Sequence, residues 1–254
     1  MIMNRKLAAN ILLLSCAIFF SADNSFAEVS LSRKLGLKIK TIYIDPAYGG
    51  KERGPKLAKN TYGKNITLLV AQKLQARLTE AGFTVYLSRE GDQHVPLETR
   101  TFRSKAKGTD IYLAIRISNH KKDCIRLFTT TLPKERKPVQ NIETKKLNER
   151  NSDLNEILKS MQVDDKIEES INLALKLETK LQTNQNVGCI KIQPLYDYIL
   201  LNTDMPTVIV DFGISNPSHK TPYILNTETQ DQVVAVIAAS VKEYSDERAP
   251  SPTQ

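Results

Sequence analysis

The sequence is poor in histidine and cysteine, with three of each among 254 residues. His94, His120 and His219 all fall in stretches expected to be loops, where single histidines are usually surface residues, so they do not predict a metal site of their own. No serine, histidine and aspartate set lies in the strand-to-helix elbow that serine hydrolases use. The sequence therefore supports neither a serine hydrolase nor a rebuilt histidine metal centre.

Long apolar runs are also missing beyond the amino terminus, so no transmembrane segment is predicted after residue 27. The amino terminus has Arg5 and Lys6, an apolar run over 7–20, and small residues at 25 and 27. This pattern is typical of a secretory signal peptide over 1–27. A lipoprotein signal cut before Cys16 is the alternative, although residues 17–20 are still apolar. We expect an exported protein that is periplasmic or associated with the cell wall.

The net charge is positive, at +8 for the whole chain. Loss of residues 1–27 removes Arg5, Lys6 and Asp23 and lowers this value by one. A basic exported protein favours anionic partners such as cell-wall polymers, lipid head groups or acidic proteins, and nucleic acid is not expected. The charge can equally serve solubility alone.

Cys124 and Cys189 remain after the signal peptide is removed, in an oxidising compartment. An even pair of cysteines there invites a disulfide. Both residues open stretches that are predicted to be strands, so a bridge requires the two strand starts to lie close together. Two buried free thiols are the alternative, and the sequence does not decide between them.

Short apolar runs alternate with helical patterns along the chain. Strands are predicted at 40–45, 83–88, 110–117, 124–130, 187–193 and 207–212, and helices at about 65–81, 96–105, 164–181 and 228–244. Continuous apolar strands separated by helices are typical of a sheet covered on both sides. We predict an α/β domain over 28–245, with a single central mostly parallel sheet of about six strands and helices on both faces.

One segment does not follow this alternation. Residues 132–162 are charged, contain Pro133 and Pro138, and carry only a weak apolar stripe from Leu154 to Met161. They predict a partly helical insertion on the surface of the domain. Residues 246–254 are predicted to form a disordered tail.

Four ordered stretches resemble one enzyme family. TIYIDPAYGGKERG resembles an opening strand with a D-P-G-H-G-G-x-D-x-G loop, and GKNITLLVAQKLQARLTEAGFTVYLSREGD resembles a helix and a strand ending in T-R-x-x-D. VPLETRTFRSKAKGTDIYLAIRIS resembles an L-x-x-R helix before a strand ending S-I-H, and LLNTDMPTVIVDFGISNP resembles a last strand with a catalytic glutamate. Together they resemble the zinc-dependent N-acetylmuramoyl-L-alanine amidases, which cut peptidoglycan between glycan and stem peptide.

The resemblance implies where the family's site residues fall. In active members two histidines and a glutamate bind zinc, and a second glutamate acts on the water; the matching positions are Tyr48, Arg116, Gly63 and Asp211. Asp45 follows the first strand in the family pattern and is expected to organise its own loop. Zinc prefers neutral imidazoles and carboxylates. Gly63 has no side chain, a neutral phenol is a poor ligand, and a guanidinium repels a dication, so no zinc cofactor is expected.

These substitutions lead to a hypothesis about Arg116. Its side chain is expected to occupy the former metal position, with Asp211 as its partner, because a buried arginine without a partner is costly. The alternative is that Arg116 turns outward to solvent at its strand end.

Three functions remain open at this point. The favoured one is an exported pseudoenzyme with the amidase fold that binds peptidoglycan or a cell-wall partner protein. The second is an active N-acetylmuramoyl-L-alanine amidase with an atypical site built from Tyr48, Asp211 and His120. The third is a structural or regulatory protein without a functional groove, for which segment 132–162 would be the interaction surface.

Overall fold

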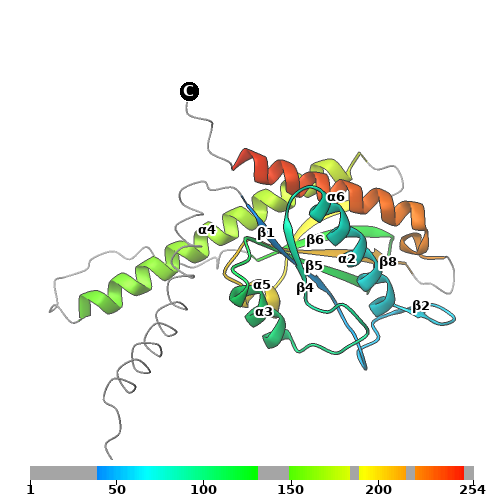
Figure 1. Ribbon diagram of the computed structural model, residues 1–254, viewed down its shortest axis with the longest axis horizontal. Helices are drawn as coiled ribbons and strands as arrows, with labels where there is room; N and C mark the ends of the chain where they lie inside the picture. The colour runs from blue at the N-terminus through cyan, green and yellow to red at the C-terminus, as the bar shows by residue number, and fades with distance from the viewer. Residues whose placement is uncertain (1–38, 131–148, 184–188, 216–220, 249–254) are drawn as a thin grey trace, which may run out of the picture.

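The computed structural model describes residues 39–130, 149–183, 189–215 and 221–248, with side chains left out over 149–162 (Figure 1). The predicted signal peptide lies outside these residues, as do residues 132–148 of the predicted insertion (132–162) and the last six residues of the predicted tail. Within the described residues, no helix combines the length and the apolar character that a membrane span requires.

A six-stranded sheet forms the centre of the domain, in the order β4-β1-β5-β8-β6-β7. Its strands are β1 (Thr41–Pro46), β4 (Thr84–Leu87), β5 (Ile111–Asn119), β6 (Cys124–Thr129), β7 (Ile190–Pro194) and β8 (Thr207–Ile214). The four strands β4, β1, β5 and β8 are parallel, β6 is antiparallel to β8, and β7 is parallel to β6. The predicted α/β fold with a mostly parallel sheet is confirmed.

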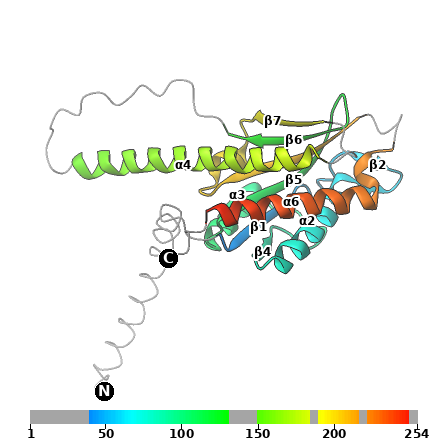
Figure 2. The ribbon, with the colours of Figure 1, turned by 90° about the horizontal axis from the view of Figure 1, so that it is seen from above.

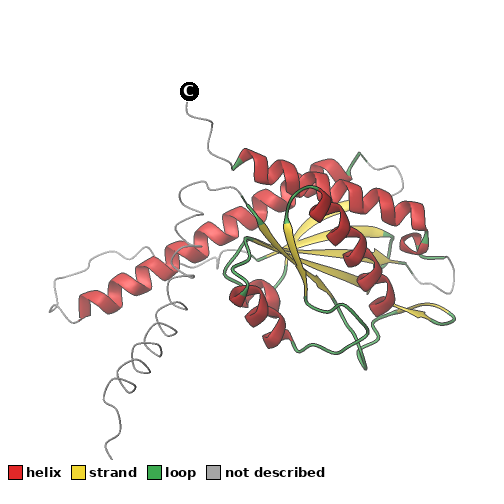
Figure 3. Ribbon diagram, in the orientation of Figure 1, coloured by secondary structure: helices red, strands yellow, loops and turns green. Residues whose placement is uncertain are grey.

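Helices cover both faces of this sheet (Figure 3). One face carries α2 (Gly63–Glu80), α4 (Glu149–Leu181) and α6 (Thr227–Glu247), and the other carries α3 (Leu97–Ala106) and α5 (Tyr198–Asn202). A single 3-10 turn, Tyr223–Leu225, precedes α6. We call these two sides the α2/α6 face and the α3/α5 face.

The α2/α6 face holds the main apolar core. Alternate residues of the central strands point to it, among them Ile42, Ile115 and Val210, all with no exposed surface. Leu74 and Leu78 of α2 pack against them, four residues apart and therefore on one side of the helix. The buried side of α2 thus follows the helical period, although Leu69 of the same helix is 40% exposed.

The α3/α5 face has a smaller apolar cluster and a row of charges. Tyr43, Ala114 and Ile209 belong to its apolar cluster. Positions two residues further along the same strands share that face, which puts Asp45, Arg116 and Asp211 there. The sequence therefore assigns opposite chemistry to the two sides of the same strands.

Residues 47–54, which follow β1 and contain Gly49, Gly50 and Gly54, form what we call the glycine loop. Two elements next to this loop were not predicted. A short hairpin of β2 (Lys56–Ala58) and β3 (Thr61–Tyr62) leads directly into α2. The start of α2 is capped by Asn65, whose side chain accepts a hydrogen bond from the Tyr62 backbone N–H at 3.0 Å. Helix α5 was also missed, because five residues are too few for a periodic pattern.

The segment predicted as an insertion is partly a regular helix. The helix predicted at 164–181 begins earlier, since α4 runs without interruption from Glu149 to Leu181. Figures 1 and 2 show its amino-terminal half extending beyond the rest of the domain, on the side away from β2. At the other end of the chain α6 continues to Glu247, so the predicted tail begins later than residue 246.

Candidate functional site

Asp45, near the end of β1, lies in a buried hydrogen-bond network. Its carboxylate is fully buried and accepts hydrogen bonds from Arg100 Nη1 at 2.8 Å, from Tyr112 Oη at 2.8 Å and from Ser88 Oγ. The Arg100 guanidinium also donates to the Val95 carbonyl at 2.7 Å. Both charges are therefore paired and hydrogen bonded, which a buried ion pair requires.

A second buried arginine holds the loop after β1. Arg89 donates to the carbonyl oxygens of Pro46 at 3.1 Å, Ala47 at 3.0 Å and Lys64 at 2.8 Å. It belongs to the stretch that resembles the family's T-R-x-x-D motif, and Arg100 belongs to the one that resembles L-x-x-R. Both arginines thus bond to backbone carbonyls of the loop after β1.

Tyr48 fills the space at the centre of this loop. Its backbone has φ = 68°, an uncommon value for a bulky residue. The phenol donates to the Ile117 carbonyl at 2.5 Å, at the far end of β5. Burial raises the pKa of the Tyr48 phenol above its ordinary value. The side chain is therefore a neutral hydrogen-bond donor whose hydroxyl is already engaged.

Two glycines border the Tyr48 ring. A Cβ placed on Gly54 would lie 2.7 Å from ring carbons of Tyr48, and one placed on Gly63 would lie 3.1 Å from the ring and 2.9 Å from Pro55 Cδ. Contacts this short are rarely seen for real Cβ atoms. Position 63 thus has no room for a side chain while Tyr48 occupies its present place.

Arg116 lies beside Tyr48 but does not pair with Asp211. Its Nη2 donates to Asp197 Oδ2 at 3.0 Å, and its side chain is 26% exposed. The predicted Arg116–Asp211 ion pair is therefore wrong. The alternative of an Arg116 turned fully into solvent is also not what the structure shows.

Asp211 is instead held by Arg126. The two residues form an ion pair, and Ser118 Oγ donates to Asp211 Oδ2 at 2.8 Å. The strand register gives Asp211 two arginine neighbours, Arg116 on β5 and Arg126 on β6. Asp211 can therefore pair with Arg126 instead of Arg116. Asp211 is 1% exposed, so its charge needs a close cation, and Arg126 supplies it.

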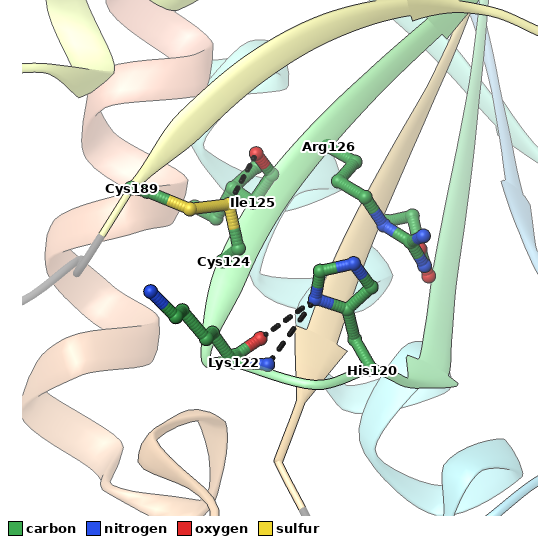
Figure 4. The surroundings of a disulfide bond; sticks show 7 residues. His120, Lys122, Cys124, Ile125, Arg126 and Cys189 are labelled. Atoms are coloured by element: carbon green, nitrogen blue, oxygen red, sulfur yellow. Dashed lines mark hydrogen bonds and ion pairs between the residues drawn. A yellow bond between two sulfur atoms is a disulfide. The ribbon is translucent and has the colours of Figure 1, made fainter.

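His120 does not join these residues through a hydrogen bond. Its Nδ1 lies 3.0 Å from the Lys122 carbonyl oxygen and accepts from the Lys122 N–H at 3.3 Å (Figure 4). Over the described part of the chain, no group of three or more His, Cys, Asp and Glu side chains is arranged to hold a metal ion.

A cavity of about 310 Å³ opens between the glycine loop and the two helices of the α3/α5 face. It brings together three of the predicted site residues, Asp45, Tyr48 and Arg116. Its other lining residues are Ala47, Glu52, Leu97, Arg100, Ala114 and Ile199. Gly63 borders the Tyr48 ring, and Asp211 lies one strand away with its own partner.

Sequence reasoning missed three residues of this site. Arg100 was present only as part of a family motif, and Arg126 stood as a charged residue inside an apolar strand. The position of Arg126 could have predicted an ion pair, because a charge in a buried strand needs a partner. Asp197 had no signal in the sequence, since it reaches Arg116 from 81 residues away.

The two remaining cysteines form a disulfide. Cys124 starts β6, Cys189 immediately precedes β7, and their Cα atoms are 4.7 Å apart (Figure 4). The bond closes a 65-residue separation that includes α4. A loop of this length corresponds to about 4 kcal/mol of stabilisation in the chain-entropy model. The open question of bridge or free thiols is thus decided in favour of the bridge.

Two solved N-acetylmuramoyl-L-alanine amidases share this fold. An N-acetylmuramoyl-L-alanine amidase from Clostridium difficile 630 has a TM-score of 0.60 and 19% identity, covering 82% of this chain and 98% of that one. The amidase AmiC2 of Nostoc punctiforme has a TM-score of 0.59 and 16% identity, covering 81% and 96%. At these identities the likeness establishes the fold.

Sequence comparisons extend this likeness to the family. The germination-specific N-acetylmuramoyl-L-alanine amidase of Bacillus subtilis is 26% identical over 238 residues, 92% of this chain and 90% of the relative. AmiA of Salmonella typhimurium is 22% identical over 224 residues, 82% and 76% of the two chains. The N-acetylmuramoyl-L-alanine amidase model, Amidase_3, matches residues 42–243. The chain belongs to this family.

Proposed function

We propose that this protein is an exported, non-catalytic member of the amidase family that binds peptidoglycan through the cavity beside Tyr48. The observation that carries the proposal is the Tyr48 side chain. Its ring lies between Gly54 and Gly63, and its hydroxyl donates a hydrogen bond to the Ile117 carbonyl. In this position it takes up the space into which the family's ligands would converge.

The side chains at the family's ligand positions do not fit a zinc ion. Tyr48 is a neutral phenol with a raised pKa, so it is not a ready anionic ligand. Gly63 has no donor atom. Arg116 places a permanent positive charge where a dication would need a neutral or negative group. Asp211, at the position of the catalytic glutamate, is neutralised by Arg126.

The cavity favours a binding role over a purely structural one. Its volume of about 310 Å³ lies at the lower end of the range of small-ligand sites, and it is lined by residues at the family's site positions. Helix α4 projects away from the β2 side of the domain, so its described backbone gives no support to a lid over the cavity (Figure 2). Recognition of peptidoglycan, or of a wall-bound partner, is therefore assigned to the cavity and its rim.

Two measurements on the purified chain test the proposal. Metal analysis after incubation with zinc should find far less than one ion per chain, and incubation with purified sacculi should release no stem peptide. Sedimentation of the protein with insoluble sacculi should deplete it from the supernatant at physiological salt. Repeating the sedimentation at high salt measures how much of the binding is charge alone.

Each outcome separates the three functions. One zinc per chain, or clear peptide release, would establish the active amidase instead. Absence of turnover together with absence of sedimentation would leave the structural or regulatory role. Sedimentation without turnover supports the proposal.

A further inference from the structure

The cavity contains one cation with unused hydrogen-bonding capacity. Asp45 and Arg100 are engaged with each other and with neighbouring groups, and the Tyr48 hydroxyl is engaged by Ile117. Arg116 has a single hydrogen-bonded partner among the described residues, Asp197, which it contacts through Nη2. A guanidinium has five N–H donors in a planar fork, so most of this one is still available.

Asp197 contacts the Arg116 guanidinium with only one of its two carboxylate oxygens. Asp197 uses one oxygen for Arg116 and the other to cap α5, where Oδ1 accepts from the Ile199 N–H at 2.9 Å. It therefore cannot offer both oxygens to the guanidinium. A free carboxylate can bind in the bidentate mode, which is stronger and more specific than a single contact.

Part of the cavity wall is apolar. Leu97, Ala114 and Ile199 line the cavity, and Leu97 is 41% exposed. Glu52 lines the same cavity and has a partly exposed carboxylate, which disfavours a second negative charge on the occupant. These features select a ligand with one carboxylate beside a short aliphatic group.

We propose that Arg116 is the receptor for the terminal carboxylate of a short peptide whose last residue has a small aliphatic side chain. The peptide carboxylate takes the open edge of the guanidinium, and the side chain packs on Leu97, Ala114 and Ile199. Asp197 acts as an internal competitor that holds Arg116 in position when the cavity is empty. This inference rests on the proposed wall-binding function and names the chemical group that the site recognises.

The test uses two probes that differ by one charge. N-acetyl-alanyl-alanine carries the terminal carboxylate, and N-acetyl-alanyl-alaninamide has nearly the same shape without it. Calorimetric titration of the full chain at low salt should show the acid binding at least about tenfold more tightly than the amide, since a charge-assisted bidentate pair is lost in the amide. Equal binding of the two probes would overturn the inference.

Two variants then assign the effect to the named residues. Arg116→Gln should weaken binding of the acid about tenfold or more and leave the amide unchanged. Asp197→Asn keeps an oxygen that can cap α5 but removes the competing charge, and it should tighten binding of the acid several-fold. Arg116→Lys, which keeps the charge but not the fork, should fall between Arg116→Gln and the unmodified chain.

The same experiments distinguish failure of this inference from failure of the proposed function. If the chain sediments with sacculi but Arg116→Gln has no effect on the acid, the inference is wrong and wall binding stands. If the acid binds through Arg116 but the chain does not sediment with sacculi, wall binding is wrong and the carboxylate site stands. Thermal unfolding of each variant verifies that a lost signal is not lost folding.

Discussion

The two faces of the sheet use the same strands in opposite ways. On the α2/α6 face, Ile115 of β5 and Val210 of β8 are fully buried in an apolar core. On the α3/α5 face, the next residues of the same strands are Arg116 and Asp211, each paired with a charge from elsewhere in the chain. Apolar contacts are non-directional and tolerate change in their neighbours, whereas each charge depends on one particular partner. Residues on the α3/α5 face can therefore differ without disturbing the core on the other face.

The largest effect is expected at the buried pair on the α3/α5 face. Asp45→Ala leaves the Arg100 guanidinium buried without its carboxylate, which costs about 3–5 kcal/mol of unfolding free energy. Urea unfolding followed by circular dichroism measures it. Asp92→Ala is the matched control, because Asp92 pairs with Lys64 but its side chain is 53% exposed. Similar losses for the two variants would show that the Asp45 network is no more important than a surface pair.

A slightly smaller loss is expected in the apolar core. Leu74→Ala removes a fully buried side chain of α2 and should cost about 2–5 kcal/mol, through lost burial and the cavity left behind. Leu69→Ala on the same helix is the control, since Leu69 is 40% exposed. If Leu69→Ala destabilises as much as Leu74→Ala, burial in the core would not explain the loss at Leu74, since alanine itself favours the helix at both positions.

Removal of the disulfide is expected to cost about 2–4 kcal/mol, because the unfolded chain gains the freedom of a long loop. The double variant Cys124→Ala with Cys189→Ala should shift the urea midpoint down, and a reductant should have no further effect on it. The unmodified chain with reductant should approach the same midpoint. A midpoint that does not change would mean that the bond does not form in the purified protein.

The smallest effect concerns the hydroxyl of Tyr48. Tyr48→Phe keeps the ring between its two glycines and removes only the bond to the Ile117 carbonyl, a loss of about 1 kcal/mol. Tyr196→Phe, at a residue that is 90% exposed, should leave stability unchanged. A gain of zinc binding by Tyr48→Phe would contradict the assignment, since the ring and Arg116 both remain in the site.

The strands and most of the helices could be predicted from local patterns. All six predicted strands are present within a few residues of their predicted ends, because continuous apolar runs need the cover that a central sheet provides. The errors fall where the pattern is weak. The hairpin before α2 and helix α5 are too short to show a period, and α4 begins in a charged stretch with little apolar spacing.

The candidate site could be located from the sequence but not completed. Resemblance to the family selected Tyr48, Gly63, Arg116 and Asp211, and the cavity does gather Tyr48 and Arg116. The ion pair between Arg116 and Asp211 was wrong because β6 adds a second arginine on the other side of Asp211. The order of strands in a sheet depends on contacts between distant segments, which local patterns do not contain.

By itself, the sequence determined the alternation of strands and helices, the cover on both faces of the sheet, and the residue types available at the site. Only the tertiary structure decided which charges pair, that Cys124 meets Cys189, and that the Tyr48 ring takes the space beside Gly63. The physical reason is the distance along the chain over which each interaction acts. Apolar periodicity acts within an element, whereas ion pairs, disulfides and close packing need atoms brought together from far along the chain.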